Sequence, residues 1–354
     1  MTTATLPRPE IHVSRATPAD VGCSWAETVL ATEQSHLAHA PEWFTAIPSA
    51  YGHDPLYLSA QDAEGRRAVL PAFVVRRPVI GTVISSMPFL DGGGPCAPSG
   101  ALGDALVARL IEEGGRVGAA AVEVRCAQRL ALASEPMEHK VNLTLPLPDD
   151  PERLWKQLDG SVRSRVRRAE RRGLSVEFGG AEKLDDFYAI YVTRMHELGS
   201  PAHARRFFTA VFDAFGRRAR VALVRLGGVP VGGLIALAFK DVLGVPWVSC
   251  LSQHFKLFPN MLLYWAALRA GCEEGFRTFD FGRSSRGSGT HRFKQQWGAT
   301  EQTLFWYTIP LGRASARPPA RDSGRAAFFV RSWRHLPLPV TRTLGPHIRK
   351  YLTQ

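Results

Sequence analysis

The sequence predicts an α+β fold in which one arrangement of strands and helices is used twice. The chain has 354 residues, which is long for one hydrophobic core and favours two domains. Its 45% hydrophobic and 21% charged residues are typical of a folded globular protein rather than a disordered one. Each half contains, in order, a strand, a helix, several antiparallel strands, another helix and a further strand, which is the order of an α+β domain.

In the first half, residues 11–16 are predicted to form a strand, and Thr17-Pro18-Ala19-Asp20 is a helix start that leads to a helix ending near Leu37. Gly65 lies in a turn between two apolar runs and indicates a hairpin. The segment Asp91–Pro95 contains three glycines, so we expect a turn with conformations that only glycine adopts cheaply. The remaining elements are strands at 55–60, 67–75, 81–90, 120–126 and 140–148 and a helix at 101–113.

In the second half, a helix is predicted from residue 154 to Gly173, whose glycine is a typical C-terminal cap. Asn260 is expected to cap a later helix. Two hairpin turns are expected at residues 227–228 and 240–241. The remaining elements are helices at 182–198 and 204–215 and strands at 174–178, 220–226, 231–239, 245–252, 277–282 and 303–309.

Two segments follow the second half. Residues 311–325 are rich in Pro, Arg, Ser and Ala and are predicted to form a linker. Residues 326–354 form an amphipathic segment, in which Phe329, Trp333 and Leu336 share one helical face. Two interpretations stay open for this helix: docking onto its own protein, or peripheral contact with a membrane.

The chain is strongly basic, with 44 Lys and Arg against 32 Asp and Glu and a net charge of +12. This excess favours an anionic partner: nucleic acid, a phosphorylated carrier or an acidic membrane face. The five cysteines are scattered without a CxxC pair, which argues against a disulfide framework and against a zinc site, so we expect no metal. No secretion signal and no run of about 18 apolar residues are visible, and we therefore expect a cytoplasmic protein.

The densest positive charge lies in the helix around residues 163–172. Val162, Val166 and Ala169 fall on one side of this helix, and the arginines cover the remaining surface. A solvated basic surface is one interpretation. We favour contact with phosphate or nucleic acid, because arginines crowded on about three turns repel one another unless an anion lies nearby. The six arginines are Arg163, Arg165, Arg167, Arg168, Arg171 and Arg172.

A second basic region follows the strand predicted at 277–282. It is a Gly/Ser/Arg segment that could present backbone N–H groups and positive side chains to an anion, although a solvated connection is the alternative. It contains no GxxxxGK[ST] and no GxGxxG that opens a helix, so nucleotide-hydrolysing and dinucleotide-binding sites are excluded. It also lacks the Gln/Arg-x-x-Gly-x-Gly/Ala loop of acyl-CoA acetyltransferases. Its charged residues are Arg283, Arg286, His291, Arg292 and Lys294.

Two motifs resemble the FemAB family. The stretch "MLLYWAALRAGCEEGFRTFDFGRSSRGSGTHRFKQQWGA" resembles the family's C-terminal signature, and "VRSRVRRAERRGLSVEF" is similar to its basic helix before a strand. The branch that the chain resembles most accompanies exosortase/PEP-CTERM and exopolysaccharide systems, and "WRHLPLPVTRTLGPHIRKYL" also resembles that branch. The resemblance implies two tandem GNAT (acyl-CoA N-acyltransferase) domains, each with a mixed, largely antiparallel sheet flanked by helices. The first would cover 1–148 and be completed by a returning strand at 301–310, and the second would cover 149–300.

The resemblance also implies a function. Well-known members of the family move an amino acid from aminoacyl-tRNA to a cell-wall precursor, so the donor here would be aminoacyl-tRNA or acyl-CoA, with no tightly bound cofactor. Lys294 corresponds to the lysine that is thought to stabilise developing negative charge, and Asp91 lies where relatives carry an acidic residue near the acceptor.

The residues themselves allow acyl transfer, which needs a deprotonated nucleophile and an oxyanion stabiliser but no metal. His291 could assist proton transfer or be merely solvated. Asp280 could act as a base or simply orient a turn. Phosphate would be held by Arg165, Arg168, Arg172, Arg283, Arg286 and Arg292, all lining one groove.

We therefore predict a transferase that moves an acyl or aminoacyl group to an amine or hydroxyl of a cell-envelope or exopolysaccharide precursor. It would work in the cytoplasm, where the inner face of the membrane is within reach of residues 326–354. One alternative is an acyl-CoA-dependent N-acyltransferase. Another is a non-catalytic basic adaptor that binds nucleic acid or a membrane.

Overall fold

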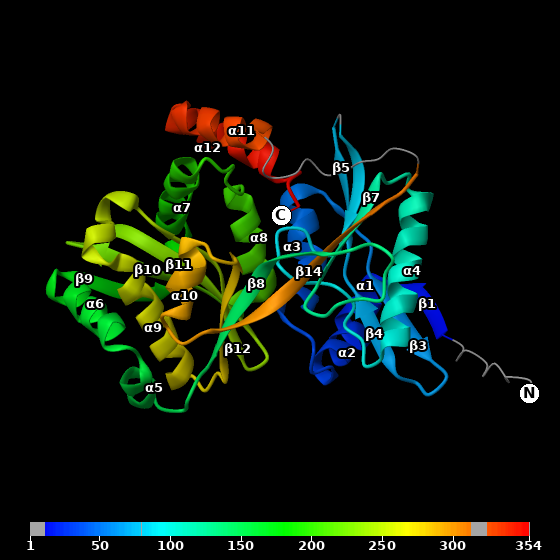
Figure 1. Ribbon diagram of the computed structural model, residues 1–354, viewed down its shortest axis with the longest axis horizontal. Coiled ribbons are helices and arrows are strands. Elements are labelled where there is room, and N and C mark those ends of the chain that lie inside the picture. Colours follow the sequence, from blue (N-terminus) through cyan, green and yellow to red (C-terminus); the bar gives the residue numbers. More distant parts are fainter. Residues whose placement is uncertain (1–10, 79, 313–323, 354) are drawn as a thin grey trace, which may run out of the picture.

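The computed structural model describes residues 11–78, 80–312 and 324–353, which form two halves side by side (Figure 1). The first half contains β1 (Ile11–Arg15), α1 (Pro18–Asp20), α2 (Ala26–Ala31), α3 (Trp43–Tyr51), β2 (Asp54–Pro55), β3 (Leu58–Asp62), β4 (Arg67–Leu70), β5 (Phe73–Arg77), β6 (Gly81–Ser85), α4 (Gly100–Arg116) and β7 (Ala121–Cys126).

The second half is longer and ends in two helices that lie along its edge. It contains β8 (Met137–Pro146), α5 (Pro151–Gln157), α6 (Gly160–Arg171), β9 (Leu174–Gly179), α7 (Leu184–Leu198), α8 (Arg205–Phe215), β10 (Ala219–Leu226), β11 (Val229–Phe239), β12 (Val242–Cys250), α9 (Pro259–Glu273), β13 (Thr278–Ser285), α10 (Gly289–Gln295), β14 (Thr300–Pro310), α11 (Gly324–His335) and α12 (Leu338–Arg349).

One sheet runs through both halves. Its strand order is β2-β5-β6-β7-β14-β8-β13-β12-β11-β10-β9, and β1, β3 and β4 form a separate three-stranded sheet. Neighbours are antiparallel except for the pairs β6–β7 and β12–β13, which are parallel. Each parallel pair is joined through a helix, α4 in the first half and α9 in the second. The prediction of an α+β fold with mixed, largely antiparallel strands flanked by helices is therefore confirmed.

Strand β14 joins the halves. Its residues 305–310 pair with β7, and residues 300–306 pair with β8, so the last strand returns beside the first half as expected. Strand β8, which we placed at the end of the first domain, also pairs with β13. The two halves therefore contribute strands to one common sheet. The division of the chain at residue 148 stays a prediction.

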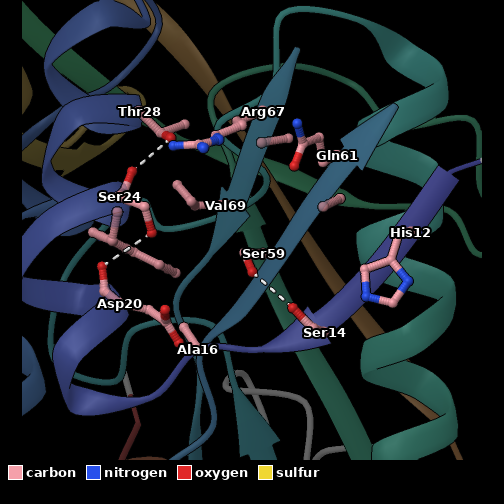
Figure 2. A pocket seen from close by; sticks show the side chains of 13 residues that line it. His12, Ser14, Ala16, Asp20, Ser24, Thr28, Ser59, Gln61, Arg67 and Val69 are labelled. Carbon is pink, nitrogen blue, oxygen red and sulfur yellow. Dashed lines mark hydrogen bonds between the residues drawn. The ribbon is translucent and has the colours of Figure 1, made fainter. Parts of the chain in front are cut away.

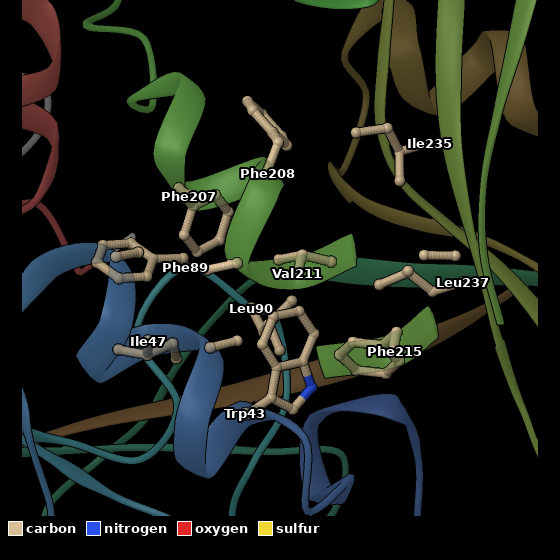
Figure 3. Packing of buried hydrophobic residues seen from close by; sticks show 14 of the residues in the cluster. Trp43, Ile47, Phe89, Leu90, Phe207, Phe208, Val211, Phe215, Ile235 and Leu237 are labelled. Carbon is tan, nitrogen blue, oxygen red and sulfur yellow. The ribbon is translucent and has the colours of Figure 1, made fainter. Parts of the chain in front are cut away.

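A hydrophobic cluster also crosses the boundary between the halves (Figure 3). Trp43 on α3 meets Phe215 on α8 edge to face, with ring centroids 4.9 Å apart. Phe89, in the loop after β6, contacts Phe207 in the same way at 5.7 Å. Trp43 and Phe207 are completely buried. Such a buried, closely packed aromatic contact fixes the two halves relative to each other.

Local signals predicted several boundaries correctly. Thr17 caps α1 in a capping box with Asp20, and Gly173 adopts a positive φ of 80° directly after α6. Gly227 and Gly228 both have positive φ and form the tight turn between β10 and β11. These positions obey rules that depend only on neighbouring residues.

Other boundaries were wrong. The helix expected to end near Leu37 stops at Ala31, because Thr32 is extended and its hydroxyl bonds back to the carbonyl of Thr28. The helix expected from residue 154 breaks at Asp159, whose side chain caps α6 by accepting from the Ser161 N–H.

The structure corrects two further expectations and adds two helices. Asn260 lies inside α9, which starts at Pro259. The strand expected at 81–90 ends at Ser85. Helices α3 and α10 were not predicted at all. Helix α3 contains an internal proline, Pro48, and α10 is only seven residues long, so both give weak helical signals.

The C-terminal segment forms a hairpin of two helices, α11 and α12, on the outer side of α7. Of the three apolar residues expected on one face, only Trp333 is buried, whereas Phe329 and Leu336 stay exposed. Most of the linker expected at 311–325 lies outside the described residues. Among the described helices, none is long and apolar enough to cross a membrane.

Candidate functional site

A cavity of about 340 Å³ lies between the two halves. Its walls come from the segment 33–39, the loop around Asp91, the residues after β7, and one face of strands β8, β12, β13 and β14. Alternation along β13 explains which side it occupies, because neighbouring side chains of a strand point to opposite faces. Phe279 and Phe281 pack against Tyr264 of α9, whereas Asp280 and Gly282 line the cavity.

The cavity lies where two parallel strands stop pairing. Strands β12 and β13 are hydrogen-bonded only at residues 242–244 and 278–280. Pro246 follows in β12 and has no N–H to donate to a neighbouring strand. Open edges at the carboxyl ends of parallel strands are common ligand sites.

Asp280 is the carboxylate that best fits a chemical role in this cavity. Its Oδ1 accepts hydrogen bonds from Asn142 Nδ2 at 2.9 Å and from the Gly282 N–H at 2.8 Å. Its Oδ2 has no hydrogen-bond partner among the described residues and is therefore available to a ligand. Burial, aided by the negative charge of Asp91, raises the pKa of Asp280 above its usual range.

Gly282 allows this arrangement. The pairing of β13 with β8 shifts between Asp280 and Arg283, and Gly282 has a φ of 71° there. This bulge turns the Gly282 N–H back toward Asp280. Bulges are frequent next to active sites because they redirect a side chain.

Asp91 lies at the rim of the same cavity. Its carboxylate forms an ion pair with Arg283 Nε at 3.0 Å, and its carbonyl oxygen accepts from Trp306 Nε1 at 3.3 Å. The guanidinium groups of Arg125 and Arg283 each lie over the ring of Trp306, 5.0 Å from its centroid. Arg283 thus binds a carboxylate of its own protein through Nε, while its Nη1 has no hydrogen-bond partner among the described residues. The expectation that it holds phosphate stays a prediction.

Lys294 is 7% exposed and does not line the cavity. Its ammonium donates to the carbonyl oxygens of Gly282 and Arg283, each at 2.8 Å, and burial lowers its pKa to about 8. The expected direct stabilisation of a reacting oxygen stays a prediction, and the charges of Asp91 and Asp280, which line the cavity, both act on this ammonium. In the structure Lys294 holds the bulge next to Asp280 through its two carbonyl contacts.

The other residues of the Gly/Ser/Arg segment bind one another. His291 Nε2 lies 2.6 Å from Glu301 Oε2, and Arg286 forms an ion pair with the same carboxylate at 3.3 Å. Arg292 donates to the Gly287 carbonyl at 2.7 Å. None of these three residues lines the cavity. His291 and Arg292 stabilise the start of α10 through Gly287, whereas Arg286 is bonded to Thr303 and Glu301 on β14. Their expected roles in proton transfer and phosphate binding stay predictions.

The arginines of α6 lie on the other face of the sheet. The buried Val162, Val166 and Ala169 belong to the same apolar cluster as Phe279 and Phe281, so α6 and α9 together cover the face opposite the cavity. We had expected the α6 arginines and the region of Arg283 to line one groove. The structure instead places them on opposite faces of the sheet.

The α6 arginines lack acidic partners: within the described ranges, none of the six forms an ion pair with a carboxylate. Arg168 lies over the ring of Phe258 at 5.5 Å, and Arg172 donates to the Lys256 carbonyl at 2.6 Å. Both residues therefore flank the N-terminus of α9, an end that favours anions.

Two histidines that sequence reasoning missed also line the cavity. His39 Nδ1 accepts from the His36 N–H, and its Nε2–H donates to the Gly94 carbonyl at 2.9 Å. Burial lowers the pKa of His39 to about 4 and that of His36 well below its usual range, so both rings are neutral. Gly92 is needed beside them, because a Cβ there would come within 2.2 Å of the His36 ring. The sequence around them, "SHLAH", carries no motif that indicates a site.

A second, smaller hollow of about 150 Å³ lies in the first half (Figure 2). Its polar side chains bond within the protein: Ser14 with Ser59 at 3.1 Å, and Thr28 with the Ser24 carbonyl at 2.8 Å. None of the catalytic or phosphate-binding residues predicted from the sequence lines this hollow. Among the described residues there is also no cluster of three or more His, Cys, Asp or Glu that could hold a metal ion.

The low pKa of Lys294 gives a testable pH dependence of stability. Between pH 8 and 10.5 the unfolded chain keeps the Lys294 proton while the folded chain loses it, so the free energy of unfolding rises with pH in this window. The contribution amounts to about 3 kcal/mol. We expect the free-energy difference between the wild type and Lys294→Met to change by about that amount, measured by urea unfolding at both ends of the window. Equal pH slopes for the two proteins would contradict the burial of the charge.

Residues 158–295 match the family model of the acetyltransferase (GNAT) domain. No curated protein matches the sequence. The fold resembles that of FemX, with a TM-score of 0.66 and 14% identity over 84% of this chain and 97% of FemX.

Two further solved structures are similar. A tandem GNAT protein from the clavulanic acid biosynthesis pathway gives a TM-score of 0.58 and 13% identity over 86% of this chain and 100% of that one. L-PGS from Bacillus licheniformis gives a TM-score of 0.55 and 11% identity over 96% of this chain and 98% of that one. The chain therefore has the tandem GNAT fold and carries an acetyltransferase (GNAT) domain, which confirms the predicted fold and the prediction of an acyltransferase.

Proposed function

We propose that this protein transfers an acyl or aminoacyl group from a phosphate-rich carrier to an amine or hydroxyl group, with Asp280 as the general base. The observation that carries this proposal is the carboxylate of Asp280 in the cavity between the halves, with a raised pKa and an available oxygen. Perturbed carboxylates in a cavity are typical of acid–base catalysts.

The step balances as follows. The nucleophile attacks the carbonyl carbon of the donor and gives its proton to Asp280 Oδ2. The bond from that carbon to the carrier then breaks, and the proton passes to the departing atom of the carrier. Asn142 and the Gly282 N–H keep Oδ1 in place meanwhile, so Asp280 need not reorient.

The donor that we favour is aminoacyl-tRNA. The arginines of α6 beside the N-terminus of α9 form no ion pair with a carboxylate of the described residues. They suit the phosphodiester backbone of RNA, because arginine can bind phosphate through two parallel hydrogen bonds. The reactive end of the donor would reach the cavity past the ends of β12 and β13. The resemblance of the sequence to the FemAB family also favours this donor.

Acyl-CoA is the second candidate, and the GNAT domain supports it. The connection before α9 argues against a typical CoA site. It contains a 3₁₀ turn at Ser252–Leu257 and no glycine between Ser252 and Phe258, so no flexible backbone is available to wrap around a pyrophosphate. The acceptor that we propose is a cell-envelope or exopolysaccharide precursor, on the sequence resemblance alone.

Direct tests separate the two donors. The purified protein is incubated with bulk aminoacyl-tRNA or with acetyl-CoA, each in the presence of an extract of envelope precursors, and products are identified by mass spectrometry. The proposal expects loss of the aminoacyl group from tRNA and a precursor heavier by one amino acid residue. If acetyl-CoA alone supports transfer, acyl-CoA is the donor instead of aminoacyl-tRNA. If neither donor is consumed, the proposed function is contradicted.

The α6 surface provides a binding prediction. The triple variant Arg165→Gln, Arg168→Gln, Arg172→Gln should bind tRNA at least about tenfold more weakly than the wild type, with a salt dependence shallower by up to about three phosphate contacts. The matched control removes three exposed arginines elsewhere: Arg206→Gln, Arg217→Gln, Arg277→Gln. Fluorescence anisotropy over a range of salt concentrations measures both quantities. Equal losses in the two triple variants would indicate general charge attraction rather than a site on α6.

A further inference from the structure

The C-terminal helical hairpin, α11–α12, carries an unusual share of exposed apolar side chains. Six of the thirteen large hydrophobic residues that are exposed in the described chain lie between residues 328 and 352. Phe328 is 72% exposed, more than any other of these residues. Exposed apolar groups scattered singly need no explanation, but a cluster of them marks a contact surface. The cluster on the hairpin, here called the C-terminal patch, consists of Phe328, Phe329, Leu336, Val340 and Leu344.

The hairpin is held firmly by its other side. Trp333 is buried, and a Cβ added to Gly345 would lie 3.1 Å from the Ala202 nitrogen, which shows how closely α12 approaches the protein. Thr341 Oγ1 lies 3.2 Å from His196 Nδ1 on α7. Arg349 donates from Nε to His203 Nε2 at 3.1 Å. The patch is therefore exposed because the hairpin is anchored through its inner face, not because the segment is loosely attached.

The charge around the patch has one sign. Residues 324–354 contain no Asp or Glu, whereas they contain six Arg or Lys and two His. Arg331, Arg334 and Arg342 are exposed on the two helices that carry the patch. Each of these cations lies within a turn of an exposed apolar residue. A surface built to bind another protein or RNA chiefly through charge would not need five exposed apolar side chains, two of them phenylalanines.

We infer that the α11–α12 hairpin docks this protein on an anionic lipid bilayer, with the C-terminal patch in the acyl–headgroup boundary and the arginines on the lipid phosphates. Apolar side chains bordered by basic residues on helices that lie along a surface are the combination that interfacial binding requires. Both helices have twelve residues, and α12 contains an internal proline, Pro346, as suits a surface contact rather than a span. The inference does not depend on the proposed transfer reaction.

Sedimentation of the full-length protein with lipid vesicles tests this inference. The wild type should bind vesicles that contain phosphatidylglycerol much more tightly than vesicles of phosphatidylcholine alone. Phe328→Gln with Leu344→Gln should weaken binding to the anionic vesicles at least about tenfold, since it removes apolar area without changing charge. Arg331→Gln with Arg342→Gln should remove most of the preference for anionic lipid, and higher salt should do the same to the wild type.

A matched control makes the same chemical change elsewhere. Leu30 and Val229 are 65% and 62% exposed, so Leu30→Gln with Val229→Gln should leave vesicle binding unchanged. Only exposed side chains are changed, so we expect every variant to keep the thermal stability of the wild type. Vesicle binding is compared among variants that meet this condition.

Three outcomes would overturn the inference. The first is a wild type that does not sediment with anionic vesicles. The second is a control variant that loses binding as strongly as the patch variant. The third is a patch variant that loses self-association or tRNA binding while vesicle binding is unchanged, which would assign the patch to a second copy of the chain or to RNA.

Discussion

Replacing Asp280 with asparagine should lower the rate of acyl transfer by about 10² to 10³-fold while the protein stays folded, because the substitution removes the proton acceptor but keeps the size of the side chain. Asn142 and Gly282 can still hold the remaining carbonyl oxygen of the amide. The comparison is made as kcat and KM for the donor that proves active. A loss confined to KM would indicate that Asp280 only binds the substrate, and an unchanged kcat would exclude it as the base.

The pH profile sharpens this test. Asp280 accepts a proton only when ionised, so the rate should rise with pH through its pKa, which burial and Asp91 hold above the usual value. The Asp280→Asn variant should lack this acidic limb. Asp91→Asn removes a neighbouring negative charge and should move the limb to lower pH without abolishing activity. A limb that stays in place in all three proteins would mean that another group titrates.

The second large effect concerns stability. Phe207→Ala should reduce the free energy of unfolding by about 3–5 kcal/mol, because this ring is fully buried among aromatic residues of both halves and its loss leaves a cavity. Equilibrium unfolding in urea measures the change. The control Phe178→Ala removes a ring that is 42% exposed and should cost far less.

The same variant tests whether the halves form one unit. The shared cluster and the shared sheet predict a single unfolding transition for the wild type, seen alike by fluorescence and circular dichroism. Two separate transitions, with only one shifted by Phe207→Ala, would show that the halves unfold independently and that the contact between them is weak.

Much of the fold could be predicted from the sequence because its signals are local. The buried aromatic face of α8, the glycine turn between β10 and β11 and the buried side of α6 all follow from helical or strand periodicity. The elements that were missed have signals that contradict their structure. Pro48 lies inside α3, and α10 begins among glycines and serines.

The site was predicted only in part. Asp280 and Asp91 were named, and both line the cavity. Their coupling, and the higher pKa of Asp280, depend on burial between strands that are far apart in the sequence. The burial of Lys294 could not be inferred either, because a lysine next to two polar residues in a short segment usually lies in water. Nothing local placed His36 and His39 beside a loop some fifty residues later.

The position of the α6 arginines shows the same limit. Sequence periodicity placed them correctly on the outer side of their helix, but it contains no information about which face of the sheet that helix covers. The topology decides this, through the parallel strands β12 and β13 and the helix that joins them.

Strand β14 has a consequence for how the chain is made. It occupies the middle of the large sheet although it is synthesised after every other strand, so both β7 and β8 wait on the ribosome with an unpaired edge until residues 300–310 emerge. In the nascent protein, β7 and β8 therefore each have an unpaired edge that can associate with other chains until β14 is made. The central part of the sheet can therefore close only after residues 300–310 have been made, and we expect β7 and β8 to depend on this late segment for their native pairing.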